Sequence, residues 1–169
     1  MIVKNESTKP HAIPTDKRIE YGDVIVIDFG AKYNGYCADM TRTIFVGEVS
    51  KEAEKLYNFL LDVQADGTRK LVEGEDTRTI AKSVEYELNQ RNCTLIHALG
   101  HGVGIDIHEK PILSVKSSTI LKNNMVVTNE PGIYIPEDIG IRIEDTIVIN
   151  DRIPRILTNS SKHLTIIDG

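Results

Sequence analysis

Cysteine, basic charge and long apolar runs are scarce in this chain of 169 residues, and each shortage argues against a class of protein. Its two cysteines, Cys37 and Cys93, are too few and too far apart for a disulfide framework or a zinc knuckle. We therefore expect a reducing, cytoplasmic setting. The net charge of −5 and the pI near 5.5 disfavour a nucleic-acid-binding protein, which normally gathers a basic excess on one face.

Membrane and secretion signals are also missing from the sequence. No apolar run approaches the ~20 residues that a membrane-spanning helix needs. The N-terminus lacks the basic-then-apolar pattern of a signal peptide. The remaining composition, 40% hydrophobic and 27% charged, is ordinary for a globular protein, and the length fits one domain over residues 1–169.

The first clear structural pattern is a strand pair that carries two acids. The β-branched run at residues 24–27 predicts a buried strand that ends at Asp28. Asn34-Gly35 then predicts a hairpin turn, and residues 39–46 predict a return strand that begins at Asp39. Two neighbouring strands are thus expected to present one carboxylate each.

Two helices and further strands are predicted beyond this pair. Ser50 is a favourable N-cap for an amphipathic helix that runs to about residue 72, and Asp76 caps a second helix that ends near residue 92. The rest of the chain is β-rich, with a His-Gly segment at 96–107 and strands at 125–130 and 140–149. The pattern indicates an α+β protein whose helices cover one face of a sheet.

A weak repeat doubles the number of acids. The order strand end, acid, glycine, hairpin and second acid occurs at Asp28 and Asp39, and again at Glu130 and Glu144. A buried carboxylate is costly unless it is paired, hydrogen-bonded or bound to a metal. One such acid is commonly a strand-edge residue or a salt-bridge partner, but four of them with His101 between glycines predict a divalent metal site.

Six ordered motifs, which together span nearly the whole chain, carry a family resemblance. They are Asp28-Phe29-Gly30-Ala31, Gly35-Tyr36 with Ala38-Asp39-Met40-Thr41-Arg42-Thr43, His97 with Gly100-His101-Gly102, His108-Glu109 with Pro111, Asn129-Glu130-Pro131-Gly132-Ile133-Tyr134, and Gly140-Ile141-Arg142-Ile143-Glu144-Asp145-Thr146. This set resembles the pita-bread metallopeptidases. The last two motifs are similar to the Xaa-Pro branch, prolidase and aminopeptidase P, with methionine aminopeptidase as the nearest alternative enzyme.

The resemblance implies an α+β pita-bread (creatinase/aminopeptidase) fold, with a curved mixed or antiparallel sheet and helices on one face. The start of the chain resembles the middle of the family's catalytic domain. We therefore expect one metallopeptidase catalytic domain that is partial on its N-terminal side, and a homodimer in the full-length protein.

The resemblance also implies two divalent metal ions, with manganese expected first and cobalt, zinc or iron as alternatives. Asp28 would chelate one metal, His101 and Glu130 the other, and Asp39 and Glu144 would bridge both. A hydroxide between the metals would attack the peptide bond that joins an N-terminal residue to proline, so the expected partner is a peptide with proline in second position.

Five residues receive catalytic roles from the same resemblance. Glu130 would take the water's proton, and His108 would stabilise the oxyanion. His11 would lie near the leaving nitrogen, His97 on the proline side of the pocket, and Arg142 would orient the ligands. Dipeptidase and aminopeptidase activities both remain open, as do a methionine aminopeptidase-like enzyme and a non-catalytic module that binds peptides or partners.

Overall fold

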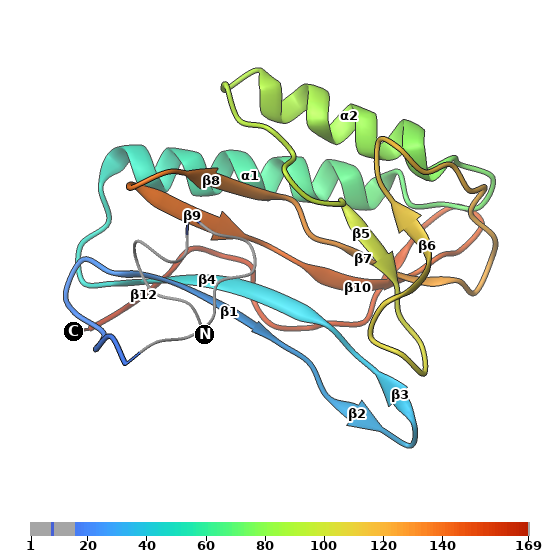
Figure 1. Cartoon of the computed structure of the whole chain (residues 1–169), viewed down its shortest axis with the longest axis horizontal. Helices are drawn as coiled ribbons and strands as arrows, with labels where there is room; N and C mark the ends of the chain where they lie inside the picture. Colours follow the sequence, from blue (N-terminus) through green and yellow to red (C-terminus); the bar gives the residue numbers. More distant parts are fainter. Residues whose placement is uncertain (1–7, 9–15, 169) are drawn as a thin grey trace.

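The computed structural model of the chain describes residue 8 and residues 16–168. In chain order its elements are β1 (Val24–Phe29), β2 (Lys32–Tyr33), β3 (Tyr36–Cys37), β4 (Met40–Val46), α1 (Lys51–Arg69), α2 (Thr77–Asn89), β5 (Gly100–Gly102), β6 (Glu109–Leu113), β7 (Val126–Asn129), β8 (Gly132–Ile135), β9 (Ile139–Arg142), β10 (Asp145–Val148), β11 (Arg155–Ile156) and β12 (Thr165–Ile167). Both helices lie on the same side of the strands (Figure 1), where α1 contacts β7 and β9 and α2 contacts β6. This is the α+β arrangement that the sequence predicts.

The strands form two larger sheets and two hairpins. One sheet has the order β1-β4-β12 and the other the order β11-β10-β7-β5-β6, while β2 pairs with β3 and β8 with β9. Among the described strand pairs, β12 runs parallel to β4 and the others are antiparallel. The β1-β4-β12 sheet is therefore mixed and the five-stranded sheet is antiparallel, in agreement with the expected mixed or antiparallel sheet.

The sequence repeat corresponds to a structural repeat. In the first unit, β1 to β4, two antiparallel strands enclose the β2–β3 hairpin. In the second unit, β7 to β10, two antiparallel strands enclose the β8–β9 hairpin. Each unit therefore places one acid at the end of its first long strand, Asp28 within β1 and Glu130 directly after β7, and another directly before its last.

Both predicted helix starts are confirmed. The Ser50 side chain accepts a hydrogen bond from the main-chain N–H of Ala53, and the Asp76 side chain accepts from the N–H groups of Arg78 and Thr79. These bonds satisfy donors that the first helical turn leaves unpaired. Both helices end about three residues before the predicted ends.

The helices and the second unit enclose the hydrophobic core. Its largest fully buried side chains include Tyr57, Leu60, Ile80, Leu88, Ile133 and Ile141. These side chains come from α1, α2 and the β8–β9 hairpin, so the second unit is held directly beneath the helix layer. No described helix is long and apolar enough to cross a membrane.

The single strand predicted at 140–149 is wrong, because the structure divides it into β9 and β10. The break falls at Ile143 and Glu144, whose main-chain N–H groups donate to Pro131 and to Thr41. Since β9 pairs with β8 and β10 pairs with β7, the chain changes partner at this point. The break sets Glu144 between the two units. The predicted segment 96–107 likewise contains only the short strand β5.

Candidate metal centre

Hydrogen bonds between the two units bring their acidic ends together. Asp39 donates its N–H to the hydroxyl of Thr146 over 3.2 Å, and that hydroxyl donates to the carbonyl of Asp39 over 2.7 Å. Beside this contact, the hydroxyl of Thr41 donates to Glu144 Oε2 over 2.6 Å. Asp39 and Glu144, from different units, are thereby fixed beside each other.

The five predicted ligands all fall within three overlapping groups of side chains. The groups are Asp28 with Asp39 and Glu144, His101 with Glu130 and Glu144, and Asp39 with His101 and His108, and the ligand atoms of each lie within 4.8 Å of one another. Asp39, Glu144 and His101 each belong to two groups. The described residues therefore include three overlapping groups that could each hold a metal ion.

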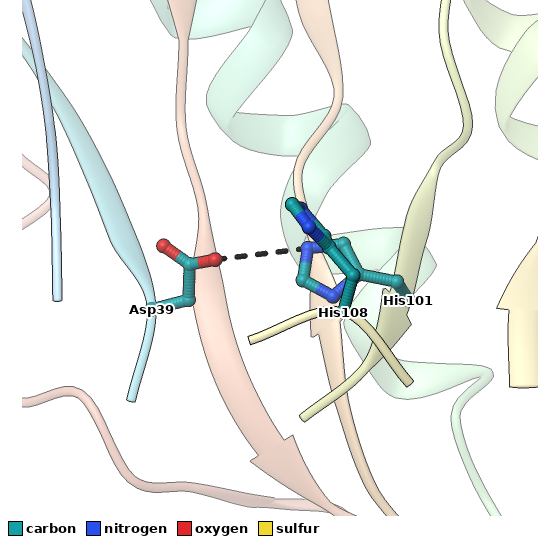
Figure 2. Close-up of side chains that lie close together, drawn as sticks. All are labelled: Asp39, His101 and His108. Carbon is teal, nitrogen blue, oxygen red and sulfur yellow. Dashed lines mark ion pairs between the residues drawn. The ribbon is translucent and has the colours of Figure 1, made fainter. Parts of the chain in front are cut away.

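His101 has the hydrogen-bonding pattern of a neutral metal ligand. Its Nδ1 lies 3.0 Å from the carbonyl of Gly102, which assigns the ring proton to Nδ1. Its Nε2 lies 3.6 Å from Asp39 and 3.4 Å from Glu130, and Figure 2 shows the imidazole facing the Asp39 carboxylate. Burial lowers the pKa of His101 and favours this neutral form. The Nε2 lone pair is thus directed at two carboxylates.

The glycines on either side of His101 allow the strand to pack closely against its neighbours. A Cβ on Gly100 would lie 2.1 Å from the carbonyl oxygen of Thr128, and one on Gly102 would lie 2.4 Å from that of Lys110. Neighbouring strands would have to move apart to admit any side chain. Glycine at both positions therefore keeps His101 in a central strand beside β7.

The acids of the cluster resist ionisation in the absence of a cation. Burial, followed by the charge of Asp28, raises the pKa of Asp39 to about 6. Burial raises the pKa of Glu130 to about 8, and burial together with the charge of Glu130 raises that of Glu144 to about 9. Crowded buried carboxylates gain most from a divalent ion, which neutralises several of them at once. The donor set therefore fits a metal centre of oxygen ligands with one imidazole.

Arg142 and Tyr134 support this cluster from its edge. Arg142 donates to Asp28 Oδ2 over 2.6 Å, to the Thr41 hydroxyl over 3.1 Å and to the Tyr134 hydroxyl over 3.0 Å. The Tyr134 hydroxyl also lies 3.0 Å from His97 Nε2. Arg142 therefore contacts the candidate ligand Asp28. Sequence reasoning missed Tyr134 and Thr41, although both lie inside the motifs that carry the resemblance.

The cluster forms one wall of a cavity of about 620 Å³ that is also lined by His97 and His108. The ring of His108 packs edge-on against that of His101, with 4.3 Å between centroids (Figure 2). Ile107 and Ile112 add apolar surface to the lining. The cavity thus joins candidate ligands, histidines and apolar surface. His11, the remaining predicted catalytic residue, lies outside the described residues.

An α+β fold with two strand-hairpin units, and carboxylates and a histidine where the units meet, is the arrangement of a metal-binding domain. The sequence model of metallopeptidase family M24 matches residues 1–151, and the chain belongs to this family. The family is metal-dependent, and the described residues include side-chain groups that could hold a metal.

Individual relatives agree with this assignment. The chain is 44% identical to the uncharacterized peptidase YqhT of Bacillus subtilis and 41% identical to an Xaa-Pro dipeptidase of Pyrococcus furiosus, over 95% of its length in both cases. It superposes on the solved Xaa-Pro dipeptidase of Bacillus anthracis with a TM-score of 0.95 and 39% identity, covering 98% of this chain and 47% of that one. The predicted pita-bread fold is thereby confirmed. The chain spans about half the length of the curated relatives it matches, 46% and 47% respectively.

Proposed function

We propose that residues 1–169 form the metal-binding part of one catalytic domain, in an enzyme that hydrolyses the bond between an N-terminal residue and proline. The observation that carries the proposal is the placement of Asp28, Asp39, His101, Glu130 and Glu144 in overlapping groups with ligand atoms within 4.8 Å. The substrate class is supported by relatives named Xaa-Pro dipeptidase.

The geometry supports different roles for the five ligands. Among the carboxylates, Asp39 and Glu144 each belong to two of the three groups, as bridging ligands must, whereas Asp28 and Glu130 each belong to one. His101 also belongs to two groups, but with Nδ1 near the Gly102 carbonyl it offers only Nε2, which can bind one ion. We assign Asp28 to one metal, and Glu130 with His101 to the other. Two divalent ions, for which manganese is the first expectation, would when bound supply an activated water and polarise the scissile carbonyl.

The remaining roles belong to side chains of the cavity. Glu130, which accepts a hydrogen bond from the Thr128 hydroxyl over 3.3 Å, is assigned to take up the water's proton. His108 lies beside His101 at the cavity and is assigned to stabilise the oxyanion. His97 has its Nε2 engaged by Tyr134, so we assign it to shape the wall that receives proline. His11 retains its predicted role beside the leaving nitrogen.

The test is cleavage by the purified chain after metal removal and reloading with Mn²⁺. Three substrates are compared: an Xaa-Pro dipeptide, a tripeptide with proline second, and a methionyl peptide without proline. We expect metal-dependent cleavage before proline, lost with a chelator and restored by Mn²⁺. The ratio between the dipeptide and the tripeptide separates dipeptidase from aminopeptidase activity.

Two outcomes would replace the proposal. Cleavage of the methionyl peptide alone would favour a methionine aminopeptidase-like enzyme. Binding of Mn²⁺ without cleavage of any substrate would favour a non-catalytic peptide-binding or partner-binding module. The matched variant Glu144→Gln keeps the shape of the side chain and removes its charge, so any activity that persists in it does not come from the proposed centre.

The setting and assembly of the whole protein belong to the same proposal. A cytoplasmic location is supported by the two cysteines, which are both unpaired in the structure. A homodimer of the full-length protein rests on the family resemblance, and sedimentation of that protein with bound Mn²⁺ tests it.

A further inference from the structure

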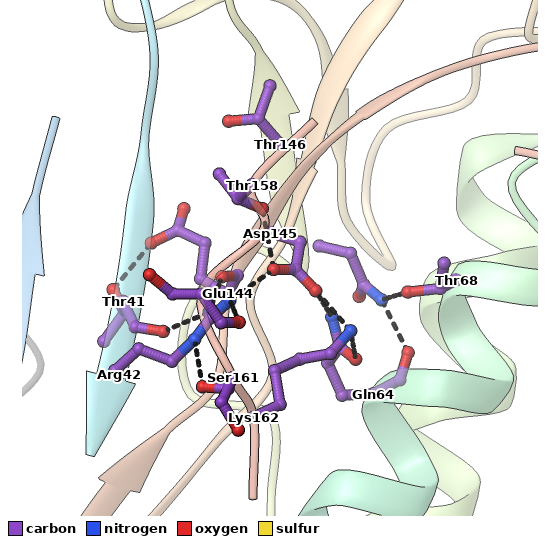
Figure 3. A network of polar contacts seen from close by, with 12 residues as sticks. Thr41, Arg42, Gln64, Thr68, Glu144, Asp145, Thr146, Thr158, Ser161 and Lys162 are labelled. Carbon is purple, nitrogen blue, oxygen red and sulfur yellow. Dashed lines mark hydrogen bonds and ion pairs between the residues drawn. The ribbon is translucent and has the colours of Figure 1, made fainter. Parts of the chain in front are cut away.

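The most completely buried charge of the second unit is Asp145, which follows the candidate ligand Glu144 and is 0% exposed. Its Oδ1 accepts hydrogen bonds from Arg42 over 2.8 Å and from the Thr158 hydroxyl over 2.7 Å. Its Oδ2 accepts from the amide of Gln64 over 2.9 Å and from the ammonium of Lys162. Figure 3 shows these donors arriving from a strand, a helix and the C-terminal segment.

The charge of this cluster differs from that of the metal centre next to it. Asp145 faces two cations, Arg42 Nη2 at 2.8 Å from Oδ1 and Lys162 Nζ at 2.5 Å from Oδ2, whereas the carboxylates of the metal centre crowd against one another. A buried ion pair of this kind is weak evidence for stability, because apolar side chains of similar size often stabilise a core equally well. Its connections suggest a different role.

Arg42 extends the cluster to the main chain of the candidate ligands. Its Nη1 donates to the carbonyls of Thr41 and Glu144, Nη2 donates to the carbonyl of Ser160 over 2.9 Å, and Nε donates to that of Ser161 over 3.1 Å. The carboxylate of Glu144 in turn accepts from the Thr41 hydroxyl over 2.6 Å. Arg42 thus holds Thr41 and Glu144, which form one of the contacts between the two units.

The C-terminal segment completes the arrangement. β11 pairs with β10 in one sheet, and β12 pairs with β4 in the other. The chain between them therefore crosses from the second unit to the first and supplies Thr158, Ser160, Ser161 and Lys162 to the cluster. This segment lies beyond residue 151, where the match to the family model ends.

We propose that Arg42 and Asp145 are positioning residues of the metal centre. This buried pair fixes the main chain of Glu144 so that the Glu144 carboxylate can bridge two ions. The inference rests on the proposed function, because it takes Glu144 as a bridging ligand. A bridging carboxylate must satisfy two ions at once, so a small displacement weakens both bonds. Groups that orient ligands typically change metal affinity by about 10-fold to 100-fold.

The experiment compares Arg42→Lys with the unmodified chain, using Mn²⁺ alone as the probe. Lysine keeps the positive charge beside Asp145 but cannot reach the carbonyls of Thr41, Glu144, Ser160 and Ser161 together. Calorimetric titration measures the affinity of both ions, and electron paramagnetic resonance detects the magnetic coupling of a manganese pair. We expect at least tenfold weaker binding of one ion and loss of the coupled signal in a variant that remains folded by circular dichroism.

The matched control is Lys162→Met. Lys162 contacts Oδ2 of Asp145 and the Gln64 side chain, with no hydrogen bond from its ammonium to Thr41 or Glu144 in the described structure. We expect a lower unfolding temperature with Mn²⁺ affinity within about twofold of the unmodified chain. This control separates loss of buried charge pairing from loss of positioning.

Unchanged Mn²⁺ affinity and an unchanged coupled signal in folded Arg42→Lys would overturn the positioning role alone. If that variant does not fold, Asp145→Asn, which keeps the shape of the carboxylate, decides the question by the same two measurements. Failure of the unmodified chain to bind Mn²⁺ would instead overturn the metal centre, and this inference with it.

Discussion

The two strand-hairpin units share a chain plan but differ in how deeply they are buried. In the first unit the side chain of Asp28 is 48% exposed, and Tyr33 in the hairpin is 79% exposed. In the second unit Glu144 is 2% exposed and Ile133 in the hairpin is 1% exposed, because the helix layer covers this unit. The same arrangement of acids therefore lies in two environments.

Because of this difference, the acids of the two units differ in how readily they ionise. Burial raises the pKa of Asp39 in the first unit to about 6, but it raises that of Glu144 in the second unit to about 9. The second unit thus holds acids that remain protonated near neutral pH until a cation compensates them. The carboxylates of the exposed unit ionise more readily, and the carboxylates of the buried unit are held more rigidly in place.

The largest expected effect tests whether the two units contribute unequally to the affinity for Mn²⁺. Glu144→Gln should lower Mn²⁺ affinity at least a hundredfold, more than the positioning groups around metal sites typically do. Asp28→Asn should lower it less, since Asp28 belongs to one ligand group and Glu144 to two. Calorimetric titration of both variants measures the ratio. Equal losses would contradict the division between a chelating and a bridging ligand.

Core packing should show the same asymmetry in the free energy of unfolding. Ile141→Ala in the second unit removes a fully buried side chain and should cost about 2–5 kcal/mol. Tyr33→Ala in the exposed hairpin should change stability by about 0.5 kcal/mol or less. Urea unfolding of the two variants gives both values. A cost below about 1 kcal/mol for Ile141→Ala would show that the second unit is less tightly packed than the structure describes.

The stability of the metal-free chain should fall as pH rises. The pKa values of Glu130 and Glu144 are raised from 4.5 to about 8 and about 9 in the folded chain. The contribution of these two protonated carboxyl groups to the free energy of unfolding is therefore fully present below about pH 4.5, and it is lost as pH rises through these values. A loss on the order of a few kcal/mol between pH 5 and pH 8 is expected in a chelator, and saturating Mn²⁺ should remove it.

Variants assign this pH dependence to one unit. Glu144→Gln cannot ionise and should flatten the slope, whereas Asp28→Asn removes an ion-pair partner of Arg142 and should leave the slope largely intact. Chemical unfolding at the two pH values compares them. An unchanged slope in Glu144→Gln would show that its carboxyl is not the group responsible.

Local features of the fold could be predicted from local sequence. The strand that carries Asp28 and the helix starts at Ser50 and Asp76 each depend on residues within a few positions of one another. The grouping of the five ligands followed from motifs that the family resemblance supplied. Spacing alone could not have shown that Asp39 lies beside Glu144, because hydrogen bonds across 103 and 107 positions set this contact.

The features that sequence reasoning missed depend on distant partners. The break before β10 occurs because the N–H of Glu144 donates to the carbonyl of Thr41 in the other unit. The parallel pairing of β12 with β4 depends on where the chain returns after β11. Tyr134 received no role because a tyrosine in a hairpin has no chemical signature until His97 and Arg142 are seen to meet it.

The smallest expected effect concerns the turns of the two hairpins. Asn34 and Gly35, in the first, adopt positive φ angles of 48° and 88°, which suit these residue types. In the second, Glu137 adopts a φ of 62°, a left-handed conformation that is unfavourable for a residue with a Cβ. Glu137→Gly should therefore stabilise the chain by up to about 1 kcal/mol, whereas Gly35→Ala should destabilise it by about 1 kcal/mol. Thermal unfolding of the two variants compares the turns directly. A loss of stability in both would mean that contacts of the Glu137 side chain outweigh its backbone strain, so that the buried unit also depends on its turn.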